Sequence, residues 1–298
     1  MAAKTVAIIG AGRVGSSVGF LLRRAGYTVT AIVASTEESA EKARAFIGSG
    51  KAMTDVLQAA LTADVVFITT PDKVIKKVCD AIASGDGFRP GMLVVHTSGA
   101  HTLDLLASAR GSGSYRAVIH PLQSIPSREL GVKNVPGSYF RLETDPEALT
   151  PSRVLIKALG GHELDMPGWF SDKSSPALYH AGAVAVSNFF VALVDFGLCY
   201  YQALGADKKE ALKAVLPLIK GTLANIESAG IPGALTGPIV RGDVVTVRDH
   251  ITAMRKRAPE LLGLYRELAK HTILVAKERR ALSPEVLQEL SDAVEQED

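Results

Sequence analysis

The sequence predicts an α/β first half, built as a doubly wound parallel sheet, followed by an all-helical second half. Up to about Pro167, short apolar runs rich in Val and Ile alternate with amphipathic stretches. Near-continuous apolar runs of this kind are typical of parallel strands that are covered by helices on both faces. Beyond that point strand signals nearly vanish, and Gly and Pro separate long helical stretches. With 298 residues, and about 150 residues per domain, we expect two domains, residues 1–166 and 167–298.

The predicted elements follow this order along the chain. In the first half we expect strands at residues 5–9, 28–33, 65–69, 92–95 and 116–119, and helices at 14–25, 37–46, 73–84 and 103–109. A strand at 138–142, a helix at 146–159 and a strand at 162–164 extend the sheet at one edge. The second half predicts helices at 175–204, 208–228, 243–256, 260–277 and 284–295. Because Ser, His and Asn interrupt the uncharged run at residues 174–194, we interpret it as a buried helix rather than a membrane span.

The composition excludes several classes of protein. At 47% hydrophobic and 21% charged residues, the chain is an ordinary globular one. Lys and Arg total 33 against 31 Asp and Glu, and this balance does not suggest a nucleic-acid partner. Two cysteines, Cys79 and Cys199, are too few for a disulfide framework or a cysteine-rich metal site. With no signal-peptide pattern at the start, we expect a soluble cytoplasmic protein without a metal.

A glycine-rich motif follows the first predicted strand and opens the first helix. It consists of Gly10, Ala11, Gly12, Arg13, Val14 and Gly15. Glycines at this spacing permit a tight turn and a close approach of the backbone to a pyrophosphate, and the helix N-terminus favours negative charge. A bare GxGxxG is weak, but its place in a strand–turn–helix unit strengthens the signal. The alternative is a tight turn that binds nothing.

The end of the second strand bears on the choice of cofactor. NAD-binding proteins usually place Asp or Glu there, whereas this chain has Ser35 and Thr36. Small hydroxyl residues are compatible with a 2′-phosphate, which Arg13 could reach. Glu37 and Glu38 complicate this interpretation, although they also suit a helix N-terminus. We expect NADP, with NAD not excluded.

Three other strands end in polar sequences. In open α/β sheets, ligands bind beyond the carboxyl ends of the strands. These are Thr69-Thr70-Pro71-Asp72, His96-Thr97-Ser98-Gly99 and His120-Pro121-Leu122-Gln123-Ser124. We assign Thr70 and Pro71 to the cofactor site, and Ser98 and Ser124 to the substrate. Turn chemistry is the alternative, and it accounts for Asp72 and Ser98. It accounts less well for His120, because histidine has no special role in turns.

Two segments of the second half also carry polar groups of interest. On the 175–204 helix, His180, Asn188 and Asp195 share one face about 100° wide, facing a ligand, a subunit contact or solvent. Further on, the stretch from Leu235 to Asp243 contains Thr236 and Arg241. Arg241 is suited to a carboxylate or phosphate, or to an ordinary surface ion pair. Asp243 is also a good N-cap.

Five motifs together resemble a known group of bacterial oxidoreductases. They are GAGRVG at residues 10–15, HTSGA at 96–100, HPLQS at 120–124, YHAGAVAVSN at 179–188 and LTGPIVRGD at 235–243. The group has a Rossmann-like N-terminal half and a helical C-terminal half, the domain of unknown function 2520. It is similar to the β-hydroxyacid dehydrogenase superfamily, which includes 6-phosphogluconate dehydrogenase and ketopantoate reductase. The resemblance covers essentially the whole chain, and it implies a homodimer.

The resemblance also implies roles for individual residues. In that superfamily the helix that opens the second domain usually carries a catalytic Lys, with Asn one or two turns later. Asn188 fits the later position, but His180 and Val184 occupy the earlier ones, and Lys173 precedes the helix. We therefore assign His180 as the proton donor and Asn188 to orient the carbonyl.

The remaining assignments complete the hypothesis. His120 is the reserve acid, and Arg241 pairs with a substrate carboxylate, beside Thr236 and Asp243. The expected reaction is NADPH-dependent reduction of a small, ketopantoate-like oxo acid to a hydroxy acid. The alternatives are an imine reductase of the pyrroline-carboxylate type and a non-catalytic dinucleotide-binding sensor or assembly protein.

Overall fold

A computed structural model describes residues 4–168 and 174–296 of the chain. Residue contacts divide the chain into two compact units, Met1–Ser187 and Asn188–Asp298. This division lies further along the chain than the predicted domain boundary between residues 166 and 167. The predicted boundary stays a prediction.

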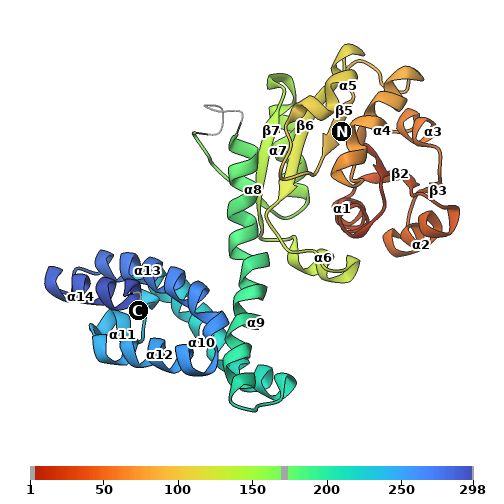
Figure 1. Cartoon of the computed structure of the whole chain (residues 1–298). Coiled ribbons are helices and arrows are strands. Elements are labelled where there is room, and N and C mark those ends of the chain that lie inside the picture. Colours follow the sequence, from red (N-terminus) through yellow and green to blue (C-terminus); the bar gives the residue numbers. More distant parts are fainter. Residues whose placement is uncertain (1–3, 169–173, 297–298) are drawn as a thin grey trace. The chain divides into compact units, whose positions relative to one another are not determined.

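The first unit is organised around one eight-stranded sheet (Figure 1). The strand order is β3-β2-β1-β4-β5-β6-β7-β8, in which β1 to β6 are parallel, β7 is antiparallel to β6, and β8 is parallel to β7. The strands are β1 (Thr5–Ile9), β2 (Thr28–Val33), β3 (Lys51–Met53), β4 (Val65–Ile68), β5 (Leu93–His96), β6 (Tyr115–Pro121), β7 (Tyr139–Thr144) and β8 (His162–Glu163). The predicted α/β class and the edge extension are confirmed.

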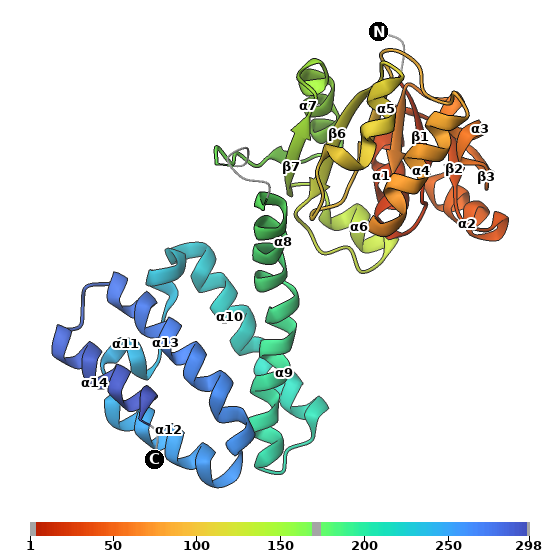
Figure 2. The ribbon, with the colours of Figure 1, turned by 45° about the horizontal axis from the view of Figure 1, so that its top comes forward.

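Helices cover both faces of this sheet, as the apolar runs predicted (Figure 2). Alternate residues of each strand supply two separate cores; in β1, for example, Val6 and Ile8 point to one face and Ala7 and Ile9 to the other. The first core includes side chains of α1 (Arg13–Arg24), α2 (Glu37–Ile47) and α7 (Leu149–Ala158). The second includes side chains of α3 (Val56–Leu61), α4 (Asp72–Ser84), η1 (Leu103–Leu106) and α5 (Ala107–Gly111). In the chain, the short helix α6 (Arg128–Asn134) lies between β6 and β7, and η2 (Pro146–Ala148) follows β7.

The second unit is helical throughout its described residues. It contains α9 (Asn188–Ala203), α10 (Lys208–Ala234), α11 (Pro238–Arg241), α12 (Val244–Arg257), η4 (Pro259–Leu261), α13 (Leu262–Glu278) and α14 (Pro284–Glu295). Its core joins α12, α13 and α14 through buried side chains such as Val247, Ile273 and Leu290. Within α10, Gly230 has a φ of 69° and interrupts the helix, two residues beyond the predicted helix end at residue 228.

The predicted buried helix at residues 175–204 needs two corrections. It forms two helices, α8 (Ser175–Val186) and α9, with Ser187 between them. The predicted burial is wrong, since Pro176 and Leu198 are the residues of α8 and α9 that are buried. Apolar residues occur on all faces of these two helices, and packing within the chain covers only some of these apolar side chains. Among the described residues, Ser175–Ala203 is the one stretch long and apolar enough to cross a membrane, and little of it is buried.

Candidate functional site

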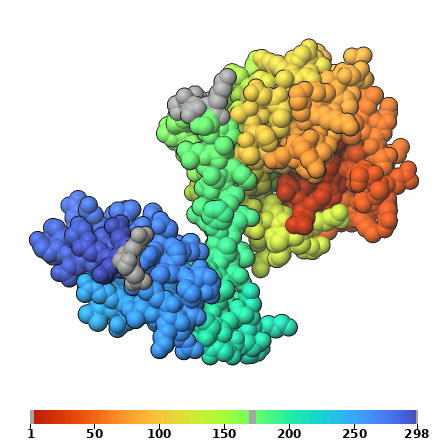
Figure 3. Space-filling view, viewed as in Figure 1, coloured from red at the N-terminus to blue at the C-terminus, as the bar shows by residue number. Residues whose placement is uncertain are grey.

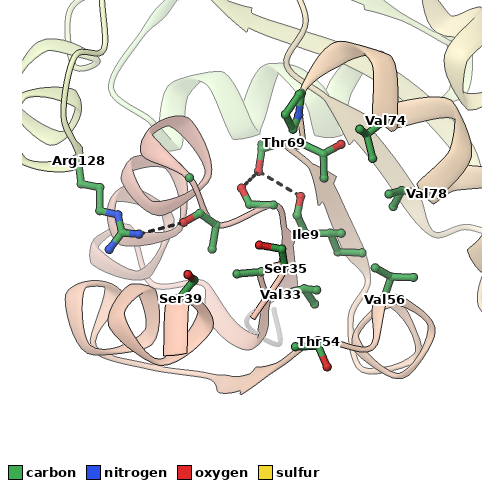
Figure 4. A pocket seen from close by; sticks show the side chains of 16 residues that line it. Ile9, Val33, Ser35, Ser39, Thr54, Val56, Thr69, Val74, Val78 and Arg128 are labelled. Atoms are coloured by element: carbon green, nitrogen blue, oxygen red, sulfur yellow. Dashed lines mark hydrogen bonds between the residues drawn. The ribbon is translucent and has the colours of Figure 1, made fainter. Parts of the chain in front are cut away.

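A cavity of about 610 Å³ lies at the carboxyl ends of β1, β2 and β4 (Figure 4). Of the predicted cofactor residues, Gly10, Ala11, Gly12, Ser35, Thr70 and Pro71 line it. Strand β1 lies between β2 and β4 in the sheet, which is the point in an open α/β sheet where the strand order reverses and ligands bind. The fold thus places the glycine motif where the sequence predicted it.

The glycine loop is held against the end of β4. Gly10 has a φ of +98°, and a Cβ there would lie 2.5 Å from the backbone nitrogen of Thr70, so the turn requires glycine. The Thr69 hydroxyl donates a hydrogen bond of 2.8 Å to the Gly10 carbonyl. A Cβ on Gly12, by contrast, would meet no protein atom within 4 Å. The loop is therefore tight on its protein side and open on the side of the cavity.

Two further observations fit a dinucleotide in this cavity. The Thr70 hydroxyl oxygen is buried and has no hydrogen-bond partner among the described residues, which is costly unless a ligand supplies one. Gly12 is the N-cap residue of helix α1, which has no side-chain cap and no acidic residue in its first turn. Its first N–H groups are therefore available to an anion. The N–H groups of α1 and the Thr70 hydroxyl together suit the phosphate groups and hydroxyls of a ligand.

The residues predicted to select the cofactor differ in whether they line the cavity. The Thr36 hydroxyl accepts a hydrogen bond from the Ser39 backbone and caps α2, while Ser35 and Ser39 line the cavity. Arg13 is exposed and lies outside the residues that line it, as do Val14 and Gly15 in the first turns of α1. Among the described lining residues there is no carboxylate, consistent with the expected tolerance for a 2′-phosphate.

A loop held by His96 follows β5. The buried His96 ring accepts a hydrogen bond at Nδ1 from the Ser98 backbone (3.1 Å), and Nε2 lies 2.9 Å from the Thr102 carbonyl. Burial lowers the pKa of His96 to about 4, so the ring is neutral and its Nε2–H donates to Thr102. The Ser98 hydroxyl donates to the Asp72 carboxylate at 2.9 Å. His96 and Ser98 therefore shape the loop and attach it to the start of α4.

Arg141 on β7, which the sequence analysis did not single out, organises the same loop. Its side chain is fully buried. Nη1 donates to the carbonyls of Ser98 (3.3 Å) and Gly99 (3.2 Å), and Nη2 donates to the carbonyl of His101 (3.0 Å). An ion pair with Glu143 supplies the counter-charge. The guanidinium thus fixes the loop after β5 to the neighbouring strand.

His120 lies opposite Arg141 and pairs with a tyrosine of α8. In the antiparallel ladder of β6 and β7, His120 is the register partner of Arg141. His120 Nδ1 lies 2.8 Å from the hydroxyl of Tyr179, and the two rings meet edge to face. The Arg141 guanidinium also lies over the Tyr179 ring, 5.9 Å from its centroid. His120 and Tyr179 are both in the first unit.

The protonation states of this pair follow from its surroundings. Burial, and then the Arg141 charge, lower the pKa of His120 to about 4. Burial raises the pKa of Tyr179 to about 12, against the opposing effect of Arg141. At neutral pH the pair is therefore a neutral imidazole and a protonated phenol. It can accept, donate or pass on one proton without carrying a charge at rest.

The cavity and the His120–Tyr179 pair are connected by residues at the carboxyl ends of the parallel strands. Pro71 lines the cavity, and the next residue, Asp72, accepts the hydrogen bond from Ser98. Ser98 in turn contacts Arg141, the cross-strand partner of His120. Because β4, β5 and β6 are parallel neighbours, their polar carboxyl ends lie side by side.

The other predicted catalytic and substrate residues are placed less tightly. His180 is exposed on α8, and Asn188 is exposed at the start of α9, in the second unit. Ser124 is exposed in the loop after β6, where its N–H donates to the Gln123 side chain. Lys173, the lysine nearest to the predicted helix start, lies outside the described residues. The roles given to His180, Asn188 and Ser124 stay predictions.

The predicted residues of the second unit have local roles. The Asp243 carboxylate caps α12 by accepting from the Thr246 backbone (3.1 Å) and hydroxyl (2.7 Å), and the Thr246 bonds lower the pKa of Asp243. Thr236 lines a cavity of about 260 Å³, and Arg241 is exposed at the end of α11. Their assignment to the substrate stays a prediction.

Three residues that sequence reasoning missed contribute to the site. Arg141 gave no signal, because its strand reads as an ordinary edge strand and its partners lie far away in sequence. Tyr179 lies within the YHAGAVAVSN motif, in which the sequence favoured its neighbour His180 as the proton donor. Arg128, at the start of α6, lines the cofactor cavity, and the short α6 was not predicted.

Comparisons with known proteins fit this geometry. The fold of the first unit is that of a Rossmann-like domain, and residues 1–121 match the family model of that domain. Residues 138–272 match a domain of unknown function, DUF2520. The chain thus combines these two domains, and the resemblance expected from the five motifs is confirmed. No curated protein matches the sequence.

Solved structures share the fold over most of the chain. Protein TM1727 from Thermotoga maritima is 26% identical, with 91% of this chain and 99% of that one covered and a TM-score of 0.68. A Bacteroides fragilis protein, provisionally named an NADP oxidoreductase, is 21% identical, with 90% and 97% covered and a TM-score of 0.69. A pyrroline-5-carboxylate reductase from Coxiella burnetii is 16% identical, with 98% and 99% covered and a TM-score of 0.55.

Proposed function

We propose that the protein is a cytoplasmic NADPH-dependent reductase that converts a small oxo acid, of the ketopantoate kind, to a hydroxy acid. The observation that carries the proposal is the chain of contacts between the glycine-loop cavity and the His120–Tyr179 pair, which runs from Pro71 and Asp72 through Ser98 and Arg141. A reductase needs a dinucleotide and a proton source close to each other. The provisional name of the similar Bacteroides fragilis protein supports the cofactor class.

The residues around the cavity suit the cofactor. The loop at Gly10 and Gly12 and the first turn of α1 would hold the phosphates, and the buried Thr70 hydroxyl would gain a partner. Ser35 and Ser39 would face the adenosine end, where the lack of a lining carboxylate favours NADP over NAD. When bound, the reduced nicotinamide supplies the hydride.

Tyr179 is the residue of this pair best suited to donate the proton. Its hydroxyl stays protonated at neutral pH because its pKa is about 12. A carbonyl oxygen that gains negative charge during reduction is a stronger base than phenolate and can take that proton. When the His120 ring carries its proton on Nδ1, it donates to the Tyr179 oxygen, and the hydroxyl proton of Tyr179 then points away from His120. His120 then supports the phenolate that forms.

The sequence-based assignment of His180 as donor is a competing proposal. His180 is adjacent to Tyr179 in sequence but exposed, and its charge contributes to lowering the pKa of His120. Asn188, to orient the carbonyl, and Arg241, to pair with a carboxylate, remain part of the proposal. Both are in the second unit.

A second candidate function is reduction of a cyclic imine. The low pKa of His120 and the high pKa of Tyr179 leave the pair without a strong acid at neutral pH. An imine that arrives protonated needs less help from an acid. The fold shared with a pyrroline-5-carboxylate reductase is consistent with this candidate.

The test compares turnover of the two substrate classes. Oxidation of NADPH is followed with ketopantoate and other oxo acids, and separately with pyrroline-carboxylate. In Tyr179→Phe, we expect kcat for the oxo acid to fall roughly 10²- to 10⁴-fold, the usual contribution of a general acid, with the Kd for NADPH unchanged. His180→Phe is the matched control.

Each outcome separates the proposals. A large loss in His180→Phe with a normal Tyr179→Phe would return the donor role to His180. Turnover of the imine alone, with little effect of Tyr179→Phe, would favour the second candidate. Tight NADPH binding with no turnover of either class would support a non-catalytic dinucleotide sensor.

A further inference from the structure

We infer that Arg128 binds the pyrophosphate of the dinucleotide, from an element outside the glycine loop. This inference rests on the proposed binding of a dinucleotide in the cavity. Arg128 is the one charged residue among the described residues that line the cavity. Figure 4 shows its side chain reaching toward the glycine loop, where Nη2 donates to the Ala11 carbonyl at 3.3 Å.

The backbone of Arg128 is fixed to helix α1. The Ser17 hydroxyl of α1 lies 2.8 Å from the Arg13 carbonyl and 3.0 Å from the Arg128 carbonyl. A Cβ on Gly131 would overlap the Ser17 oxygen, so α6 packs closely on α1. Figure 3 shows the red segment that contains α1 beside the yellow-green segment that contains α6. Arg128 therefore keeps a constant position relative to the first turn of α1.

The guanidinium has unused capacity to bind an anion. Its bond to the Ala11 carbonyl is long, and its other N–H donors have no hydrogen-bond partner among the described residues. A guanidinium presents five donors in a planar arrangement that matches phosphate oxygens. Two phosphates bring negative charge that the N–H groups of the loop and of α1 balance only in part. Arg128 is placed to supply the missing cation.

The position of Arg128 points to the phosphates shared by both dinucleotides. Its contact is with Ala11, in the loop that approaches the pyrophosphate in glycine-motif domains. The 2′-phosphate, present only in NADP, belongs at the end of β2 near Ser35. Arg128 should therefore raise affinity for NADPH and NADH alike, leaving the choice between them to other residues.

The test measures dinucleotide binding directly, without a substrate. Calorimetric titrations with NADPH and with NADH are made on the wild type, Arg128→Ala and Arg128→Gln. Arg24→Ala is the matched control, because Arg24 is an exposed arginine in the last turn of α1, outside the cavity lining. We expect both Arg128 variants to weaken both dinucleotides by the same factor, roughly 10- to 100-fold for a charged hydrogen bond. Arg24→Ala should bind as the wild type does.

Several results would overturn the inference. Unchanged Kd values in Arg128→Ala would exclude a phosphate contact, and unchanged values in Arg128→Gln would show that the charge is not needed. A loss for NADPH alone would assign Arg128 to the 2′-phosphate. If the wild type binds neither dinucleotide, the proposed function fails as well. If the wild type binds and turns over NADPH while both variants are normal, the inference about Arg128 alone fails.

Discussion

At the level of single residues, the site depends on histidines that the fold keeps uncharged. The folded-state pKa values of His96 and His120 are about 4, below the ordinary value of roughly 6.5. Unfolding therefore favours proton uptake between these two values. The stabilisation from each buried ring is complete above the unfolded pKa and is lost as the pH falls toward 4.

This behaviour gives a prediction for His96, whose side chain is fully buried. Between pH 6.5 and 4, protonation of the unfolded-state ring should lower the protein's free energy of unfolding by about 3 kcal/mol. This value follows from the difference between the folded and unfolded pKa values of the ring. Urea unfolding across this range, on the wild type and His96→Asn, measures the effect. Carboxylates that titrate in the same range cancel in the difference. Parallel pH profiles for the two proteins would contradict the assignment of His96 as a buried neutral ring.

Gly99 provides a second prediction at this scale, because it packs against His120. A Cβ on Gly99 would lie 2.8 Å from His120 Nε2 and 2.9 Å from Cε1. Gly99→Ala should displace the ring from Tyr179, lowering kcat for the reductase reaction and costing roughly 1–3 kcal/mol of stability through overpacking. Gly263→Ala is the control, since a Cβ there would meet nothing within 4 Å. Full activity in Gly99→Ala would show that the His120–Tyr179 contact is dispensable.

At the level of elements, the β6–β7 pair positions the site and attaches the loop after β5. Arg141 makes this attachment through three carbonyls and the Glu143 ion pair. Removing the guanidinium leaves Glu143, which is largely buried, without its counter-charge. The strand would also lose its connection to the loop that packs on His120.

Arg141→Met should therefore be strongly destabilising. We expect a loss of roughly 3–5 kcal/mol, as for other buried pairs from which one partner is removed. The exposed pair of Arg153 and Glu163 serves as the control, because Arg153→Met should cost no more than about 1 kcal/mol. Chemical unfolding measures both. Equal, small losses would mean that Arg141 does not hold the loop.

The strands and the cofactor loop could be predicted from the sequence, because both depend on local patterns. Apolar runs marked β1, β2, β4, β5 and β6, and the glycine spacing marked the turn before α1. The short elements β3 and α6 were missed because three to seven residues carry too little periodicity. The contacts of Arg141 and Tyr179 depend on pairing across long stretches of sequence. No pattern within one segment indicates such pairs.

At the level of the whole molecule, the second unit exposes an apolar surface. Phe189 and Val191 on α9, and Leu218 and Leu223 on α10, are each more than half exposed. A cavity of about 220 Å³ between these helices is lined almost entirely by apolar side chains. Exposed apolar side chains gathered on two contacting helices are typical of an interface. Asp195, paired with Lys208 within the same region, makes a lipid environment unfavourable.

We propose that a second copy of the chain covers this surface, as the expected homodimer requires. Sedimentation velocity should show a dimer for the wild type and a monomer for Leu218→Glu, because a buried carboxylate without a partner opposes association. Lys213→Glu, an exposed change on the same helix, should remain dimeric. A monomeric wild type, or one that binds to lipid vesicles through this surface, would contradict the proposal.

The central claim is that the glycine-loop cavity holds a nicotinamide dinucleotide and prefers the phosphorylated form. Thermal-shift titrations of the wild type with NADPH and NADH in parallel test it most directly. A ligand present at 100 times its Kd adds roughly 2.7 kcal/mol to the free energy of unfolding. The account predicts a saturable shift that appears at lower concentrations of NADPH than of NADH. No shift with either dinucleotide would contradict it.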